Sequence, residues 1–149
     1  MLSEPPKNGP DGRLQLHAST VVIDGKAVAV TGPAGSGKSG TALALMSRGA
    51  TLLADDITWL ETQGERLIAL CPPTLANCIE ARGVGILRAN SAPATELQLI
   101  VDLGVVETER LPQRRKTTLL GHEIAVLHTP ETCHFPDAIM HYMKHGRAD

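Results

Sequence analysis

A run of eight residues carries the clearest chemical signal in this sequence. It matches G-x-x-x-x-G-K-[ST] at every constrained position, and its members are Gly32, Pro33, Ala34, Gly35, Ser36, Gly37, Lys38 and Ser39. Glycines let backbone N–H groups turn inward around phosphate oxygens, where a Cβ would obstruct the turn or the anion. In such a loop Lys38 reaches the terminal phosphates and the Ser39 hydroxyl ligates Mg²⁺. We therefore expect this phosphate loop, residues 32–39, to bind a polyphosphate.

The residues on either side of the phosphate loop favour a strand before it and a helix after it. Residues 14–31 hold two β-prone runs around Asp24-Gly25, a strong signal for a two-residue hairpin. If that turn forms, Ile23 pairs with Lys26, and His17 lies opposite Gly32. His17 is then a candidate to orient a carboxylate or to contact phosphate. After the loop, Ala42, Leu45 and Met46 share one helical face, and Gly49 closes the helix.

Two acidic positions compete for the place beside the phosphate. The run TLLADD reads as a strand that ends in Asp55 and Asp56, whose side chains should face opposite sides. A carboxylate there can accept the proton of a hydroxyl that is being phosphorylated. Asp102, which ends the apolar part of the strand Leu97–Leu103, has the usual look of a Mg²⁺-binding Walker B acid. Spacing leaves the choice open.

Composition limits the other classes of function. The chain has 149 residues, 42% of them hydrophobic, which fits one domain over residues 14–149. Residues 1–13, rich in Pro, Gly and charge, are expected to form a flexible arm with too little apolar material to pack. A net charge of −2 and 2% aromatic residues argue against binding to nucleic acid or a membrane surface. Three cysteines without a C-x-x-C pair, and no long apolar run, favour the cytoplasm.

The rest of the chain supplies further elements and a few charged candidates. We expect a hairpin turning near Gln63-Gly64, a broken loop region over residues 71–91, a last hairpin around Gly121-His122, and a helix that Gly146 ends. Within the broken region, Glu80 can approach a ligand. Arg110 is a candidate to stabilise charge on a transferring phosphoryl group. Of the histidines His134, His141 and His145, the last two would lie one helical turn apart. No third ligand stands at a familiar metal-ligand spacing from that pair, so no metal site is expected there.

Three segments in order resemble the catalytic domain of the HPr kinase/phosphorylase family. They are LHASTVVIDGKAVAVTGPAGSGKS, TALALMSRGATLLADD and IEARGVGIL, the last of which looks like the family's own signature. The likeness covers roughly residues 14–112, and it implies a short form without the family's N-terminal domain. It also implies an α/β fold, a P-loop kinase core with a mixed β-sheet akin to phosphoenolpyruvate carboxykinase.

The resemblance further implies a function and a set of roles. The implied activity is an ATP- and Mg²⁺-dependent serine kinase that phosphorylates the phosphocarrier protein HPr and so regulates the phosphotransferase system, with a reverse reaction that uses phosphate and yields pyrophosphate. His17 matches the active-site histidine, and Lys38 the loop lysine. Ser39 and Glu80 match the Mg²⁺ ligands. Asp56, with Asp55 beside it, matches the proton acceptor. Arg110, in ERLP, looks like the arginine of a similar segment in the family, and residues 79–88 match a region that serves both reactions.

The chain departs from the family pattern at two other places. Gly40 stands where the family usually has an acid, and residues 112–149 lack the Pro- and Arg-rich segment with which long forms grip HPr and neighbouring subunits. Family members are commonly hexamers, so a homo-oligomer is expected. Two alternatives stay open: a conventional P-loop ATPase or small-molecule kinase that uses Asp102, and a non-catalytic nucleotide-binding regulator.

Overall fold

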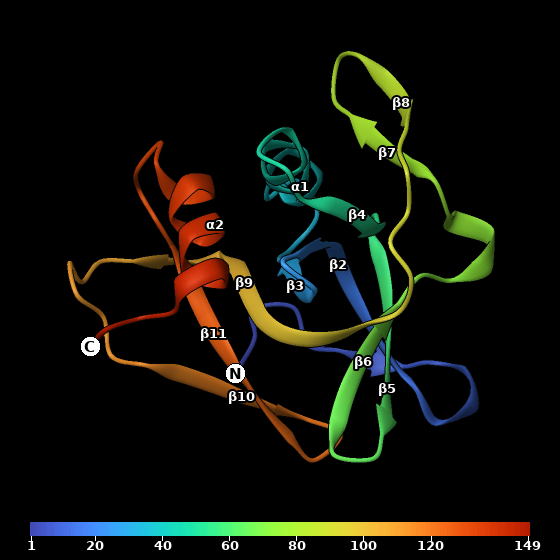
Figure 1. Cartoon of the computed structure of the whole chain (residues 1–149), viewed down its shortest axis with the longest axis horizontal. Coiled ribbons are helices and arrows are strands. Elements are labelled where there is room, and N and C mark those ends of the chain that lie inside the picture. The colour runs from blue at the N-terminus through green and yellow to red at the C-terminus, as the bar shows by residue number, and fades with distance from the viewer.

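A mixed β-sheet of nine strands forms the centre of the molecule, and both α-helices pack on one face of it (Figure 1). The computed structural model describes residues 1–149. Its strands are β1 (Lys7–Asn8), β2 (Leu14–Ile23), β3 (Lys26–Thr31), β4 (Thr51–Ala54), β5 (Ile57–Gln63), β6 (Arg66–Leu70), β7 (Cys78–Ala81), β8 (Gly85–Arg88), β9 (Thr95–Glu107), β10 (Arg115–Leu119) and β11 (His122–Pro130). The helices are α1 (Lys38–Ser47) and α2 (Phe135–His145), with short 3₁₀ turns at Pro10–Gly12 and Pro73–Leu75.

Parallel and antiparallel pairs occur together, as expected for the α/β class. Strand β9 pairs in parallel with β3 on one side and with β11 on the other, while the remaining strand pairs are antiparallel. Strand β2 pairs with β5 through residues 14–17 and with β3 through residues 18–23. The pairings β2–β5–β6–β9–β3–β2 therefore close into a ring, and one apolar cluster fills its interior.

The hairpin that leads into the phosphate loop has the predicted register. Ile23 pairs with Lys26, and Ala18 pairs with Thr31, which sets His17 beside the start of the loop. Asp24 and Gly25 both have positive φ, 52° and 74°, the backbone that a two-residue primed turn needs. Two other hairpin turns lie one residue away from their predicted places: the turn residues are Gly64-Glu65 and Leu120-Gly121.

The helices bury the expected faces. Ala42 and Leu45 of α1 are fully buried, whereas Met46 is only partly covered. Helix α2 buries Ile139, Met140 and Met143 against the same cluster and ends at Gly146. Neither helix has the length and apolar composition needed to cross a membrane.

The first residues of the chain pack more than their composition suggested. Leu2 is 5% exposed and belongs to the core cluster inside the ring of strands. Strand β1 pairs with the start of β2, with Lys7 opposite Gln15. The expectation of too little apolar material to pack is corrected here, because one leucine fills the end of the core and backbone pairing needs no apolar side chain.

The broken region expected at residues 71–91 contains a hairpin of its own. Strands β7 and β8 pair only with each other, and the hairpin extends beyond the sheet near β4 and α1 (Figure 1). Gly83 and Gly85 in its turn have φ of 82° and 139°, which a residue with a side chain adopts only under strain. The glycines that predicted a broken loop region therefore form a tight turn between two short strands.

Candidate active site

The phosphate loop is already wound into an anion cradle. It connects β3 to α1, and its three glycines, Gly32, Gly35 and Gly37, have φ of 152°, 81° and 98°. A Cβ on Gly32 would lie 2.6 Å from the Ser36 hydroxyl oxygen, so the first glycine is needed sterically as well. The Ser36 N–H donates to the Pro33 carbonyl at 3.1 Å, and the α1 N-terminus follows directly. The loop thus presents backbone N–H groups and the positive end of a helix to an anion.

The Lys38 side chain packs against the phosphate loop. The residue is only 7% exposed, and its ammonium donates to the carbonyls of Gly32 and Pro33 at 3.1 and 3.2 Å. The charge is therefore fixed at the mouth of the cradle, where the terminal phosphates of a bound nucleotide would lie.

Asp55 links three parts of the chain. Its Oδ1 accepts hydrogen bonds from the hydroxyls of Ser39 and Ser19, both at 2.7 Å. Its Oδ2 accepts the backbone N–H of Glu80 at 3.0 Å. One carboxylate thus joins the phosphate loop, strand β2 and the β7–β8 hairpin, and its hydrogen-bonding capacity is largely used by these donors.

Asp56 faces a different partner from Asp55, but a turn after β4 sets its direction, not the predicted alternation along a strand. Its Oδ1 lies 2.7 Å from Nε2 of His17, and its own N–H donates to the Ser19 hydroxyl at 3.2 Å. The Asp56 side chain is 63% exposed and its backbone φ is 69°, because β4 ends at Ala54 and the chain turns there. Asp56 therefore keeps lone pairs free for a proton from an incoming group.

Ser39, Asp55 and Asp56 border one cleft of about 380 Å³. Its walls come from the end of the phosphate loop, the residues after β4, the 3₁₀ turn at Pro73–Leu75 and the β7–β8 hairpin. Its lining residues are Ser39, Asp55, Asp56, Thr74, Leu75, Ala76, Cys78, Glu80 and Ile86. The structure contains no cluster of three or more His, Cys, Asp or Glu side chains arranged as a metal site. The oxygen donors of Ser39, Asp55 and Glu80 nevertheless fit Mg²⁺, which takes few protein ligands and completes its shell with water and substrate phosphates.

Asp102, the competing acid, lies in a closed environment. It pairs with Thr31 across the β3–β9 ladder, so it sits next to the start of the phosphate loop, yet it is fully buried. Its carboxylate accepts hydrogen bonds from the N–H and the hydroxyl of Ser3 and from the N–H of Gly104. Ser3 therefore uses acceptor sites of the Asp102 carboxylate that a Mg²⁺-binding Walker B acid would need to have free.

Arg110 lies apart from the other predicted residues, whereas Ser19 belongs to the site and was not predicted. Arg110 is exposed in the loop after β9, and no hydrogen bond or ion pair ties it to the remaining candidates. Ser19, which sequence reasoning missed, contacts both Asp55 and Asp56. Its position two residues after His17 on one strand was the available signal, because side chains at i and i+2 share a face.

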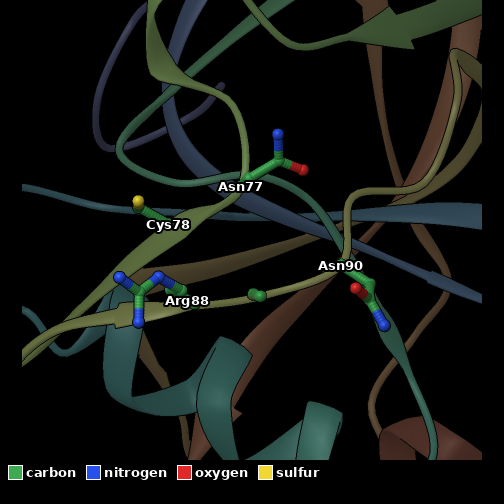
Figure 2. Close-up of a pocket in the computed structure, with 5 residues that line it drawn as sticks. Asn77, Cys78, Arg88 and Asn90 are labelled. Carbon is green, nitrogen blue, oxygen red and sulfur yellow. The ribbon is translucent and has the colours of Figure 1, made fainter.

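A second, open cavity of about 500 Å³ lies at the base of the β7–β8 hairpin, lined by Asn77, Cys78, Arg88, Ala89 and Asn90. Figure 2 shows Cys78 and Arg88 close together on the paired strands, with Asn90 further along the chain. Cys78 borders both this cavity and the cleft. Cys78, at the start of β7, thus lies between the two cavities.

Comparison with known proteins gives one consistent result. Residues 12–130 match the family described as HPr Serine kinase C-terminal domain. HPr kinase/phosphorylase of Limosilactobacillus reuteri is 36% identical over an alignment of 117 residues, and the match covers 70% of this chain and 37% of the relative. HPr kinase/phosphorylase of Chlorobium phaeobacteroides is 35% identical over an alignment of 130 residues, and the match covers 78% of this chain and 40% of the relative. The chain thus spans well under half the length of these curated relatives.

A solved structure extends the agreement to the fold. The structure of the Hpr(Ser) kinase/phosphatase from Coxiella burnetii superposes with a TM-score of 0.74 at 28% sequence identity, over 87% of this chain and 93% of that one. The expected α/β fold with a mixed sheet and a phosphate loop is therefore confirmed. This chain belongs to the HPr Serine kinase C-terminal domain family.

Proposed function

We propose that this chain is an ATP- and Mg²⁺-dependent protein serine kinase that acts on the phosphocarrier protein HPr and also catalyses the reverse, phosphorylase reaction. The observation that carries the proposal is that Ser39, the last residue of the phosphate loop, and two adjacent carboxylates border one cleft. Asp55 accepts the Ser39 hydroxyl of the loop, and Asp56 stands beside it with its carboxylate toward His17. The relatives are named HPr kinase/phosphorylase, and this name supports HPr as the protein that accepts the phosphoryl group.

Nucleotide binding follows from the phosphate loop. Its backbone N–H groups and the α1 N-terminus bind the phosphates of ATP, and Lys38 adds a fixed positive charge at the terminal phosphate. Ser39, Asp55 and Glu80 would hold Mg²⁺, which neutralises phosphate charge when bound. Asp55 also fixes the hydroxyl of Ser39 and the backbone of Glu80, so these groups are positioned before the nucleotide arrives.

Phosphoryl transfer requires a base at the acceptor. The serine hydroxyl of the acceptor attacks the γ-phosphorus, its proton passes to Asp56, and the bond from phosphorus to the ADP oxygen breaks. Lys38 offsets the charge that develops on the transferring group. We place Arg110 in the same role, carried by its loop to the bound substrates. His17, 2.7 Å from Asp56, orients the Asp56 carboxylate toward the acceptor.

The reverse reaction uses the same groups in the opposite order. Inorganic phosphate attacks the phosphorus of phosphoserine, and the bond from phosphorus to the serine oxygen breaks. Protonated Asp56 returns a proton to that oxygen, and the pyrophosphate that has formed is released. Residues 79–88, which form the β7–β8 hairpin on the wall of the cleft, serve both directions because they border the site of the transferred group. We further propose that the protein acts in the cytoplasm as a homo-oligomer.

Incubation of the purified chain with HPr, Mg²⁺ and γ-labelled ATP tests this function. The expected result is label on a serine of HPr, abolished by removal of Mg²⁺ and by the Lys38→Ala variant. Addition of phosphate to the labelled product should release the label as pyrophosphate. Tight ATP binding without label on HPr would contradict the proposal and favour a nucleotide-binding regulator.

A further inference from the structure

The N-terminal residues reach the candidate active site and are fixed on both sides of Glu4. On one side, Leu2 is buried in the core, and Ser3 donates two hydrogen bonds to Asp102. On the other side, β1 pairs with the start of β2. The backbone is therefore held in place both before and after Glu4, and this restricts the positions that the Glu4 side chain can reach.

Glu4 and Asp56 face opposite nitrogens of one imidazole ring. Oε1 of Glu4 lies 3.9 Å from Nδ1 of His17, while Oδ1 of Asp56 lies 2.7 Å from Nε2. The two carboxylates therefore flank the ring, and together they favour the ring orientation in which Nδ1 faces Glu4 and Nε2 faces Asp56.

The three side chains open into a cavity distinct from the nucleotide cleft. It has a volume of about 230 Å³, and its lining residues are Glu4, Pro5, Lys7, Gln15, Leu16, His17, Asp56 and Ile57. Asp56 borders both this cavity and the cleft with Ser39, Asp55 and Glu80. The charged and titratable groups that face His17 here are thus Glu4, Lys7 and Asp56. An acceptor that approaches Asp56 from this side meets the ring that Glu4 contacts.

We propose that Glu4 is a positioning residue for His17: its carboxylate holds the ring with Nε2 on Asp56, and so keeps Asp56 aligned for proton transfer. This proposal rests on the proposed kinase function for its catalytic consequence. Glu4 does not contact the reacting atoms, so its effect passes through His17. The Glu4 and His17 side chains are about one third exposed, at 31% and 32%, and their separation is that of an ion pair rather than a hydrogen bond. A modest effect is therefore expected.

The test compares three variants of the full chain. Glu4→Gln removes the charge but keeps the shape, and Glu4→Asp keeps the charge. Asp11→Asn is the matched control, because Asp11 is an acid of the same N-terminal segment whose side chain is 86% exposed and lies 3.6 Å from Arg13, away from His17. For each variant we measure kcat for transfer to HPr, the Kd for ATP, and the ring ¹⁵N chemical shifts of His17 at one fixed pH.

The proposal predicts a defined pattern. Glu4→Gln lowers kcat about two- to fivefold, the range of a solvent-screened ion pair, and leaves the Kd for ATP unchanged. Glu4→Asp restores kcat at least in part, and Asp11→Asn has no effect. Glu4→Gln also shifts the ¹⁵N resonances of the His17 ring, whereas Asp11→Asn does not.

Three results would overturn it. They are a Glu4→Gln protein with unchanged kcat, a Glu4→Asp protein as impaired as Glu4→Gln, and a loss confined to ATP affinity. If the unaltered chain does not phosphorylate HPr, the proposed function fails on that observation, and the NMR comparison alone then decides the present proposal. Unchanged ¹⁵N shifts in Glu4→Gln would refute it.

Discussion

Asp102 and the Asp55–Asp56 pair each follow an apolar strand near the phosphate loop, yet the chain surrounds them differently. Asp102 lies on β9, directly next to β3, and is fully buried under hydrogen bonds from Ser3 and Gly104. The pair follows β4, which is separated from β3 by β2, and it opens into the cleft. The acid on the adjacent strand is thus the structural one, and the acids one strand further away face the phosphate loop.

The difference shows how the same local pattern acquires two roles. A buried carboxylate whose oxygens accept three internal hydrogen bonds stabilises the fold around it and has no access to substrate. A carboxylate at an exposed turn, with one histidine as its side-chain partner, can exchange a proton with an incoming group. Donors supplied by distant parts of the chain, not the strand itself, make the distinction.

The largest effect in this comparison is expected for Asp56→Asn. Loss of the base should lower the rate of phosphoryl transfer to HPr by about 10²- to 10⁴-fold, the usual contribution of a general base. The Kd for ATP should stay within about twofold, because the phosphate loop is untouched. Single-turnover transfer and calorimetric titration with ATP measure the two quantities. A transfer rate equal to that of the unaltered chain would show that Asp56 is not the base.

Asp55→Asn should weaken the binding of Mg²⁺ and ATP rather than the proton transfer. The amide would lack the charge that accepts the hydroxyls of Ser39 and Ser19, so the Mg²⁺-dependent gain in ATP affinity should fall about 10- to 100-fold. Titrations of ATP with and without Mg²⁺ measure that gain. An unchanged Mg²⁺ dependence would show that Asp55 acts only on the hairpin backbone.

Asp102→Asn should affect stability. An amide offers one acceptor oxygen and places an NH₂ group toward the donors of Ser3 and Gly104, so the free energy of unfolding should fall by about 1–3 kcal/mol. Urea unfolding followed by circular dichroism measures the change. Stability equal to that of the unaltered chain would mean that these hydrogen bonds are not maintained in solution.

The smallest effect is expected at Gly40, in the first turn of α1 beside Ser39. A Cβ on Gly40 would have no heavy atom within 4 Å and its φ is negative, so the substitution causes no clash. Gly40→Ala should raise the free energy of unfolding by about 0.5–1 kcal/mol, because glycine loses more backbone entropy in a helix. The same urea experiment checks this, and a lower stability would point to a contact of the Gly40 backbone that alanine disturbs.

Local patterns predicted the parts of the site that depend on local geometry. The phosphate loop needs a fixed set of glycines and a lysine within eight residues, and the Asp24-Gly25 turn sets the register of β2 and β3 without help from the rest of the chain. The end of α2 at Gly146 is a similar case. These predictions were correct because each depends on the backbone preferences of a few adjacent residues.

The parts that spacing and composition could not decide depend on segments brought together from afar. The choice between Asp102 and the β4 acids required the strand order and the position of Ser3, which is 99 residues from Asp102. The packing of Leu2 required the shape of the core. Neither can be read from spacing. The role of Arg110 stays a prediction, because Arg110 does not line the cleft.

The assignment of the proton acceptor to the β4 acids is tested most directly by the rate of phosphoryl transfer from Mg²⁺–ATP to HPr. The rate is measured side by side for Asp56→Asn and Asp102→Asn under conditions where both are folded. We expect a loss of about 10²- to 10⁴-fold for Asp56→Asn and of less than about tenfold for Asp102→Asn, since the buried acid has no access to substrate. Loss of transfer in Asp102→Asn, with Asp56→Asn still active, would contradict this assignment and place the chemistry on β9.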